Sequence, residues 1–407
     1  MAGNHKTQVK FAGRQVWAEV NLRALADNLR SIRKHVNPAD QDRREPRKVL
    51  AVVKGNAYGH GAAPVAKALE KAGADWFGVT CSEEGIEIRN AGVKKPILVM
   101  TGFWPGEEQR IVEHSLTPAL TRCDQLALLE RAAARAARST RRTAKVARFH
   151  LKIDSGMNRL GISPGDIDCF ARQLAKCKHL RLTGVFTHFA SSEIFAPAEH
   201  GDQTPAQEKL FYQSLERLHA LGIDPGIVHL ANSAAIATRP DTWADMVRPG
   251  VILYGYHPGY DPPERRAQAE AALPLVPALS FRSRIISVRN VDAGQGVGYD
   301  ARFITERPSR IGILAAGYGD GLLRALGNRG NVLAHGKLAP IVGIVSMDVT
   351  MVDLTDVPEA AVGDEVTIYG PAGAKILPAN AVARSIGTVT SDLLCALSKR
   401  VPRFYVP

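Results

Sequence analysis

Apolar residues recur along the first two thirds of this chain in a pattern that alternates between two periods. Short apolar runs of strand length are separated by longer segments in which apolar residues return every three or four positions. Eight runs predict strands, at Val49–Lys54, Trp76–Thr80, Pro96–Met100, Leu116–Leu120, Phe149–Asp154, Leu182–Phe189, Ile227–Leu230 and Met246–Tyr254. Helices are predicted between most of them, for example at Ala62–Ala72, Cys123–Ala137 and Ala206–Leu221.

The alternation of strands and helices predicts a parallel sheet. Eight consecutive units of this length favour a closed (β/α)8 barrel of the TIM type. An open, doubly wound sheet is the alternative, but one that binds a dinucleotide carries G-x-G-x-x-G after its first strand, and no such motif follows Val53. Upstream, Gln15–Val20 alternates as a short strand, and Asn21 is placed to cap the helix that follows.

The pattern changes after His257–Pro274, a stretch rich in proline and charge that marks a domain boundary. Beyond it, short strands separated by glycine turns predict a mostly antiparallel β domain. Its predicted elements are strands at Phe281–Val291, Ser309–Ala315, Asn331–Leu338, Ala339–Ser346 and Glu365–Tyr369 and a helix at Ala379–Ile386. We predict a barrel domain at 12–260 and a β-rich domain at 261–407, with residues 12–20 as a strand that pairs with the second domain.

Composition narrows the classes of function. The chain has 407 residues, 45% of them hydrophobic, which is enough for two cores. Its formal net charge of +12 is concentrated in His35–Lys48 and Arg135–Arg148, which we predict to be surface loops. Because no aromatic residues interleave with these stretches, we expect no nucleic-acid binding, and instead a basic surface that attracts small anions.

The five cysteines are scattered, and no pair has the C-x-x-C spacing of a zinc ribbon. Such a set argues against a disulfide framework and fits a reducing compartment. The first residues, MAGNHKTQVKFAGRQ, are polar, and no apolar run reaches the roughly eighteen residues of a membrane span. We therefore expect a soluble cytoplasmic protein with no membrane partner and no metal site.

Several polar side chains stand at the predicted ends of the barrel strands. They are Lys54, Lys152, Asp154, His188, Asn232, Ser233 and Arg248. In a (β/α)8 barrel the C-terminal ends of the strands form the catalytic face, so we expect these residues to gather there. Lys54 precedes a glycine-rich turn, and a neutral lysine in such a place forms Schiff bases with aldehyde cofactors. A solvated lysine beside a helix cap is the alternative for this stretch alone.

Seven longer motifs occur in order along the chain. They are AVVKGNAYGHG at Ala51–Gly61, KIDSGMNRLG at Lys152–Gly161, THFA at Thr187–Ala190, ANSAA at Ala231–Ala235, MVRPGVILYG at Met246–Gly255, GYGDG at Gly317–Gly321 and SMD at Ser346–Asp348. With these motifs the chain resembles the alanine racemases, pyridoxal-phosphate enzymes that interconvert L-alanine and D-alanine. The resemblance extends from Trp17 to the sequence RVPRFY at Arg400–Tyr405.

The resemblance implies two bases on opposite faces of the substrate. Lys54 is implied to bind pyridoxal 5′-phosphate covalently and to act as the base on the D-alanine side. Tyr299, in the sequence VGYD, is implied to act on the L-alanine side. Tyr299 and Met347 are implied to reach the active site of a second subunit, so the resemblance also implies a homodimer with shared active sites.

The remaining cofactor contacts are likewise implied by the resemblance. Arg248 is expected to face the pyridine nitrogen, supported by His188, and an arginine can only donate a hydrogen bond. A pyridine nitrogen that stays unprotonated draws less negative charge into the cofactor ring. This favours return of the α-proton to the substrate over transamination. The implied ligands of the phosphate are Tyr58, Ser233, Gly250 and Val251.

Substrate recognition is implied at several positions. Arg159 is expected to bind the substrate carboxylate, and Met347 and Asp348 to contact it through main-chain and nearby groups. Lys152 stands where many relatives carry a carbamylated lysine, and a carbamate there would orient Arg159. The residues implied at the pocket and its access path are Tyr318 and Arg324.

The chain departs from the family at two positions. Ser391 stands where relatives often have a tyrosine that touches the phosphate and narrows the mouth of the site. The shorter serine predicts a weaker phosphate clamp or a wider mouth, and hence a broader substrate range. Ser346 stands where relatives often have cysteine, which indicates that the sulfur is not needed.

Two other functions share parts of this pattern. A basic-amino-acid decarboxylase of the same fold needs a glutamate at the pyridine nitrogen, a catalytic cysteine and a glycine-rich phosphate loop. Arg248 and the absence of a triple-glycine string argue against it. A non-catalytic pyridoxal-phosphate carrier would need neither the second domain nor Tyr299.

Overall fold

The computed structural model describes residues 13–39, 43–139, 146–195 and 201–407. By their internal contacts these residues form two compact units. One, called here the barrel unit, comprises Val20–Ala278 with Tyr405–Pro407. The other, called the β unit, comprises the segment that ends at Glu19 and Leu279–Phe404.

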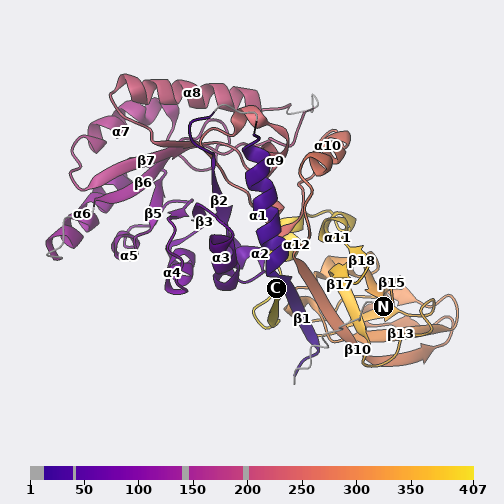
Figure 1. The fold of residues 1–407 in the computed structure, drawn as a ribbon. Helices are drawn as coiled ribbons and strands as arrows, with labels where there is room; N and C mark the ends of the chain where they lie inside the picture. The colour runs from indigo at the N-terminus through magenta and orange to yellow at the C-terminus, as the bar shows by residue number, and fades with distance from the viewer. Residues whose placement is uncertain (1–12, 40–42, 140–145, 196–200) are drawn as a thin grey trace. The chain divides into compact units, whose positions relative to one another are not determined.

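In the barrel unit the described residues form a sheet of eight parallel strands, in the order β8-β7-β6-β5-β4-β3-β2-β9 (Figure 1). The strands are β2 (Lys48–Val52), β3 (Trp76–Val79), β4 (Ile97–Val99), β5 (Thr117–Leu120), β6 (Ala147–Lys152), β7 (Leu180–Phe186), β8 (Ile227–His229) and β9 (Met246–Val247). Backbone hydrogen bonds from Asp245 N to Val228 O and from Arg248 N to Ala231 O, both 3.0 Å, join β8 to β9. The sheet therefore closes, and the predicted (β/α)8 barrel is confirmed.

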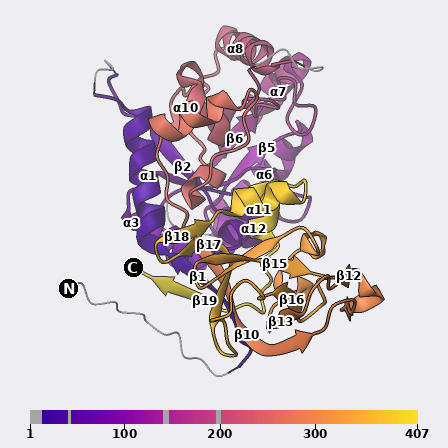
Figure 2. The same ribbon diagram turned by 90° about the vertical axis from the view of Figure 1, so that its right-hand side faces the viewer.

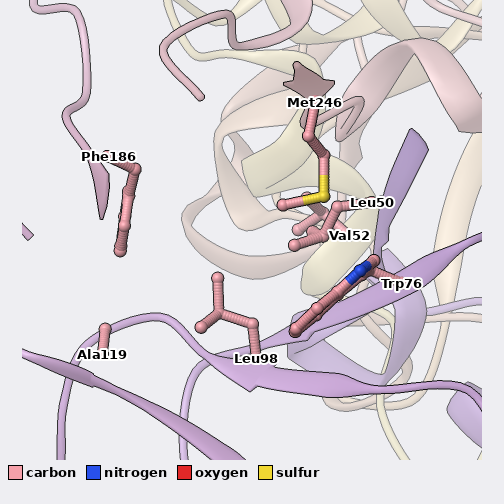
Figure 3. Close-up of a cluster of buried hydrophobic side chains, with 7 residues drawn as sticks. All are labelled: Leu50, Val52, Trp76, Leu98, Ala119, Phe186 and Met246. Atoms are coloured by element: carbon pink, nitrogen blue, oxygen red, sulfur yellow. The ribbon is translucent and has the colours of Figure 1, made fainter. Parts of the chain in front are cut away.

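Large apolar side chains fill the interior of the barrel, as Figure 3 shows. They project inward from six different strands and are almost completely buried: Leu50, Val52, Trp76, Leu98, Ala119, Phe186 and Met246. Each barrel strand packs against the other strands on its inner face and against helices on its outer face. Both faces are therefore apolar. This arrangement explains why the strands appear in the sequence as continuous apolar runs.

Helices follow most of the strands and lie outside the barrel (Figure 1). They are α1 (Leu22–Val36), α3 (Ala62–Lys71), α4 (Ser82–Asn90), α5 (Glu108–Glu113), α6 (Asp124–Ser139), α7 (Ile167–Leu174) and α8 (Thr204–Ala220). Asn21 caps α1 as predicted, because its side chain accepts a hydrogen bond from Ala24 N at 2.8 Å. The expected loop at Arg135–Arg148 is partly wrong, since Arg135–Ser139 belongs to α6 and residues 140–145 lie outside the described ranges.

The predicted strand at Met246–Tyr254 is too long. Only Met246–Val247 is extended, and Val251–Tyr254 forms the short 3-10 helix η3. Pro249 has no N–H group for a strand ladder, and Gly250 has φ −108° and ψ −102°, which turns the chain into η3. The strand therefore ends where the motif residues begin.

The boundary between the units lies at 278/279 rather than at 260/261. The stretch expected as a linker contains the helix α10 (Glu264–Ala272). Contacts of this region hold it to the barrel unit: Asn28 Nδ2 donates to Val276 O at 2.8 Å, and His257 Nε2 lies 2.9 Å from Leu273 O. The sequence pattern missed α10 because its apolar residues are all alanines, which give no strong apolar stripe.

In the described part of the β unit, nine strands form one sheet in the order β18-β17-β14-β15-β16-β13-β10-β1-β19 (Figure 2). They are β1 (Val16–Asn21), β10 (Leu279–Val291), β13 (Ser309–Leu314), β14 (Asn331–Ala334), β15 (Lys337–Val342), β16 (Thr350–Asp353), β17 (Glu365–Ala372), β18 (Lys375–Leu377) and β19 (Arg403–Val406). A two-stranded ribbon of β11 (Gly296–Val297) and β12 (Phe303–Ile304) and the helices α11 (Ala379–Ser385) and α12 (Thr390–Cys395) complete the unit. The pairings from β10 to β18 are antiparallel, as predicted.

The single strand predicted at Asn331–Leu338 is wrong. The segment is a hairpin in which β14 pairs with β15. His335 and Gly336 form its turn with φ of +46° and +75°, and glycine adopts such angles without steric cost. Across the described ranges, no helix is long and apolar enough to cross a membrane.

Candidate active site

Polar side chains converge at the C-terminal ends of the barrel strands. Lys54 follows β2, Lys152 ends β6, His188 follows β7, and Arg248 follows β9. Their charges act on one another: burial first, and then Arg248, Lys152, Arg159 and Lys54, lower the pKa of His188 well below its usual value. The predicted gathering of these residues is thus present within the barrel unit.

Lys54 begins an unusual turn, α2 (Lys54–Tyr58). Gly55, Asn56, Ala57 and Tyr58 have φ of +62°, +54°, +53° and +51°, and Gly59 follows at +79°, so five successive residues are left-handed. Each non-glycine residue pays about 1–2 kcal/mol in this conformation. The turn places the exposed Lys54 at one end and Tyr58 at the other.

The hydroxyl groups of Tyr58 and Ser233 meet at Gly250. Ser233 begins the short helix α9 (Ser233–Thr238), and its Oγ accepts a hydrogen bond from Gly250 N at 2.9 Å. A Cβ built on Gly250 would lie 2.7 Å from the Tyr58 hydroxyl and 3.5 Å from Ser233 Oγ. Val251, the first residue of η3, follows directly. These groups form a small cradle of donors, called here the hydroxyl cradle (Tyr58, Ser233, Gly250 and Val251).

Arg248 is almost fully buried and is held by acceptors of the strand ends. Its Nη1 donates to His229 O at 2.9 Å, and its Nη2 donates to Thr187 O at 2.7 Å and to Leu230 O at 2.8 Å. Burial lowers the pKa of Arg248 to about 9. Carbonyl oxygens therefore fix the guanidinium, and His188 Nδ1 is a more distant neighbour at 3.4 Å from Nη2.

Two histidines that the sequence interpretation missed continue this network into the barrel. Because arginine only donates, His229 Nδ1 accepts from Arg248 Nη1 at 3.0 Å, and its proton is on Nε2. His229 Nε2 then donates to His150 Nδ1 at 3.0 Å. Burial, followed by the charge of Arg248, lowers the pKa of His150 to about 3 and that of His229 well below its usual range, so both rings are neutral. The available signal was the position of each histidine within a barrel strand.

Lys152 is buried at the end of β6. Burial, and then the charges of Arg248 and Arg159, lower its pKa to about 8. A substantial fraction of its amine is therefore neutral at slightly alkaline pH, which is the form that reacts with carbon dioxide.

The loop after β6 presents Arg159 to solvent. Asp154 shapes it: its Oδ1 accepts from Gly156 N at 3.0 Å and Asn158 N at 2.9 Å, and its Oδ2 accepts from Arg159 N at 2.8 Å. Burial alone would raise the pKa of Asp154, but these N–H donors outweigh it and lower the pKa. An ionised Asp154 thus organises the backbone that carries Arg159.

The other predicted site residues lie in the β unit. Tyr299 is 68% exposed, Met347 53% and Tyr318 43%, so three large side chains stand outside the core of this unit. Tyr299 sits between Gly298 and Asp300, which have φ of +72° and +58°. This tight turn displays the phenol on the surface.

The loops of Tyr318 and Met347 lie against each other. Tyr318 N donates to Ser346 O and Gly319 N donates to Met347 O, both at 2.9 Å. Beneath them Asp320, which is fully buried, accepts from Arg14 Nη2 at 2.7 Å and Arg400 Nε at 2.8 Å. Arg400 also donates to Asp348 Oδ1 at 2.8 Å. The predicted site residues therefore fall into two groups, one in each unit.

Two family profiles match the chain. The profile "Alanine racemase, N-terminal domain" matches residues 20–258, and "Alanine racemase, C-terminal domain" matches residues 278–405. The chain belongs to the alanine racemase family. The start of the second profile coincides with the boundary between the two units.

Relatives of the alanine racemase family align over nearly the whole chain. The alanine racemase of Symbiobacterium thermophilum is 37% identical over 393 residues, which are 96% of this chain and 97% of that protein. The alanine racemase of Sorangium cellulosum is 38% identical over 395 residues, covering 95% and 98% respectively.

Solved structures of the alanine racemase family share the fold. The alanine racemase from D-cycloserine-producing Streptomyces lavendulae superposes with a TM-score of 0.86 at 32% identity and 98% coverage of both chains. The biosynthetic alanine racemase of Pseudomonas aeruginosa superposes with a TM-score of 0.79 at 36% identity, covering 97% of this chain and all of that one. The resemblance inferred from the motifs is confirmed.

Cavity size alone does not identify the site of this alanine racemase family member. Cavities of about 580 and 920 Å³ open at the N-terminal ends of the barrel strands and share Arg181. In (β/α)8 barrels that end contributes to stability, whereas catalysis lies at the C-terminal ends. None of the motif residues lines either cavity.

Proposed function

We propose that this protein uses pyridoxal 5′-phosphate to interconvert L-alanine and D-alanine. The observation that carries the proposal is the hydroxyl cradle, which lies one left-handed turn from Lys54. A cofactor that joins a lysine through its aldehyde and also carries a phosphate needs these two features within its own length.

The residues present fit this cofactor. The glycine at position 250 keeps open a space beside the Tyr58 hydroxyl that a Cβ would fill. The hydroxyls of Tyr58 and Ser233 and the backbone N–H of Val251 are suitable donors for phosphate oxygens. Lys54 would supply the amine that holds the cofactor covalently.

Arg248 distinguishes racemisation from the competing decarboxylation. When bound, pyridoxal phosphate acidifies the substrate's α-proton by drawing electrons into its ring. Arg248 would meet the pyridine nitrogen only as a hydrogen-bond donor, and its carbonyl partners Thr187 and Leu230 hold it in one orientation. A decarboxylase of this fold would require a glutamate at this place.

We propose two bases for the reaction. Lys54 Nζ would take or return the α-proton on the face that yields D-alanine, and Tyr299 Oη on the face that yields L-alanine. The exposed turn that carries Tyr299 suits a residue that serves a second subunit, so the proposal includes a homodimer. A general base of this kind contributes roughly 10²- to 10⁴-fold to a rate.

Substrate binding is assigned to Arg159, which would pair with the α-carboxylate, and to the loop of Met347 and Asp348. A carbamate on Lys152 would convert a repelling cation into an anion that orients Arg159. Ser391, which is half-buried in α12, replaces a bulkier tyrosine and supports a wider range of side chains. Racemisation rates for serine, lysine and arginine that are negligible beside alanine would contradict this wider range.

The function is tested by incubating the purified protein and cofactor with L-alanine and measuring D-alanine. Racemisation in both directions supports the proposal. In a parallel incubation with L-lysine, release of carbon dioxide would instead indicate a decarboxylase. A visible lysine–cofactor absorbance without turnover would indicate a carrier.

The roles of the two bases are distinguished by measuring hydrogen exchange with the Tyr299→Phe variant in deuterated water. This variant should lose racemisation while Lys54 still exchanges the α-hydrogen of D-alanine, and should not exchange that of L-alanine. Equal exchange of both enantiomers would contradict the assignment of faces.

A further inference from the structure

A carboxylate that follows a neighbouring strand is hydrogen-bonded to the turn that carries Lys54. Glu84 lies in the first turn of α4, after β3, which pairs directly with β2. Its Oε1 accepts a hydrogen bond from Gly55 N and its Oε2 accepts one from Thr80 N, both at 2.7 Å. Glu84 therefore bridges two strand ends, and one of its bonds is to the residue directly after Lys54.

Helix capping explains only one of these bonds. A glutamate at the third position of a helix commonly accepts from the backbone N–H that begins the helix, and Glu84 makes the related bond to Thr80 N, one residue before the N-cap Cys81. The N-cap residue Cys81 makes no side-chain capping bond, so α4 benefits from Glu84. The bond to Gly55 satisfies no backbone N–H group of α4, because Gly55 follows β2, whereas α4 follows β3.

The Lys54 turn requires a stabilising contact from another segment at Gly55. Gly55 is the first of its left-handed residues, and Val53, with φ −119° and ψ 19°, has already left the extended conformation of β2. Within the turn, Ala57 N donates to Val53 O at 2.9 Å and Gly59 N to Gly55 O at 3.0 Å. A backbone in a sparsely populated conformation persists only when surrounding contacts determine it, and a bond to an ionised acceptor is among the stronger ones.

The turn links the two groups that the cofactor would require. Lys54 stands at its start, and Tyr58, at its end, extends its hydroxyl to Gly250. We infer that Glu84 is a positioning residue, which fixes this turn so that the Lys54 amine and the Tyr58 hydroxyl keep a constant separation. The inference rests on the proposed roles of Lys54 and Tyr58.

The test compares three variants. Glu84→Ala removes both acceptors, whereas Glu84→Gln keeps the shape but has one acceptor oxygen for two N–H groups. Glu83→Gln is the matched control, since Glu83 lies on the same helical turn and its carboxylate accepts from Arg110 Nη1 at 2.7 Å. For each variant we would measure the affinity of the cofactor-free protein for pyridoxal phosphate, the lysine–cofactor absorbance, kcat and KM for alanine, and the melting temperature.

Glu84→Ala should weaken cofactor affinity and lower kcat by about tenfold or more each, with KM for alanine changed less than about threefold, because misplacing a catalytic group costs rate rather than ground-state binding. Glu84→Gln should show a smaller loss of the same kind, and it decides the question if the alanine variant does not fold. Glu83→Gln should stay within about twofold of the wild type.

A lowered melting temperature with unchanged cofactor affinity and kcat would show that Glu84 is only a helix cap, and would overturn the inference. If the wild type binds the cofactor but does not racemise alanine, the proposed function fails. The cofactor affinities of the Glu84 variants then still decide whether Glu84 positions the turn.

Discussion

At the scale of single residues, the site of the barrel unit is a concentration of hydrogen-bond donors and positive charge. Lys54, Lys152, Arg159 and Arg248 all act on the pKa of His188 in the same direction. The hydroxyl cradle adds neutral donors. A site of this kind binds anions, and both the phosphate of the proposed cofactor and the carboxylate of an amino acid are anions.

Gly250→Ala should weaken the binding of pyridoxal phosphate by about tenfold, because its Cβ would crowd the Tyr58 hydroxyl and overpacking costs about 1–3 kcal/mol. The double variant Tyr58→Phe/Gly250→Ala should lose less affinity than the sum of the two single losses, since the clashing hydroxyl is gone. Titration of the cofactor-free proteins measures both. Gly259→Ala, where a Cβ meets no atom within 4 Å, is the control. Strict additivity of the two losses would contradict the cradle geometry.

Lys152 should make stability depend on pH in alkaline solution. Its folded-state pKa of about 8 lies below its ordinary value of 10.5, so the cost of burying its charge is fully present below pH 8. That cost disappears as the pH rises from about 8 to about 10.5, which raises the free energy of unfolding by about 3 kcal/mol. Urea denaturation in buffers free of carbon dioxide should show this rise in the wild type and not in Lys152→Met.

Bicarbonate supplies the companion test of carbamylation. It should abolish the pH-dependent rise and add the mass of one carbon dioxide to the intact protein in an acid-labile form. An unmodified Lys152 in bicarbonate would refute the carbamate, and equal pH profiles for wild type and Lys152→Met would contradict the lowered pKa.

At the scale of elements, function depends on segments that leave strands rather than on the strands themselves. The turn after β2 is left-handed, and the loops of Tyr318 and Met347 in the β unit are tied together by backbone bonds. Asp320 holds the loops of Tyr318 and Met347, because its buried carboxylate accepts hydrogen bonds from two arginines and from Gly317 N. These segments keep their shape through specific polar contacts instead of regular ladders.

Asp320→Asn should lower the free energy of unfolding by about 2 kcal/mol, because the buried carboxylate loses its charge-assisted bonds to Arg14 and Arg400, whose side chains are 35% and 39% exposed and partly screened by solvent. Asp348→Asn, which changes an exposed partner of Arg400, should cost less than about 1 kcal/mol. Chemical denaturation of both variants measures the difference. Equal losses would mean that the burial of Asp320 does not govern this network.

At the scale of the whole molecule, the proposed active site is divided between the units. The barrel unit carries Lys54 and the hydroxyl cradle, whereas the β unit carries Tyr299 and Met347. If Tyr299 serves a second subunit, no site contains both bases without dimerisation. Assembly and catalysis would then be inseparable.

Mixing two inactive variants tests this arrangement. In a heterodimer of Lys54→Ala and Tyr299→Phe chains, shared sites would place both defects in one site and leave the other intact. After subunit exchange, the mixture should recover about one quarter of the wild-type activity, since half the dimers are mixed and each has one intact site. No recovery, with exchange verified by mass, would mean that each site draws both bases from one chain.

Local periodicity determined much of this protein. The apolar runs predicted the eight barrel strands because a strand buried on both faces must be apolar throughout, and the motifs placed Lys54 and Arg248 at strand ends. The family followed from the same motifs. Each of these features depends on neighbouring residues in the chain, which the sequence displays directly.

Tertiary structure alone decided the rest. His150 and His229 are 79 residues apart in the sequence, and their hydrogen bond exists only because two strands of the barrel face one interior. Ala57 and Tyr58 have no local preference for left-handed angles, so contacts from other segments impose that turn. The clamp of Glu84 on Gly55 has the same origin. Residues that act through distant partners leave no periodic signal, and for that reason only the fold revealed them.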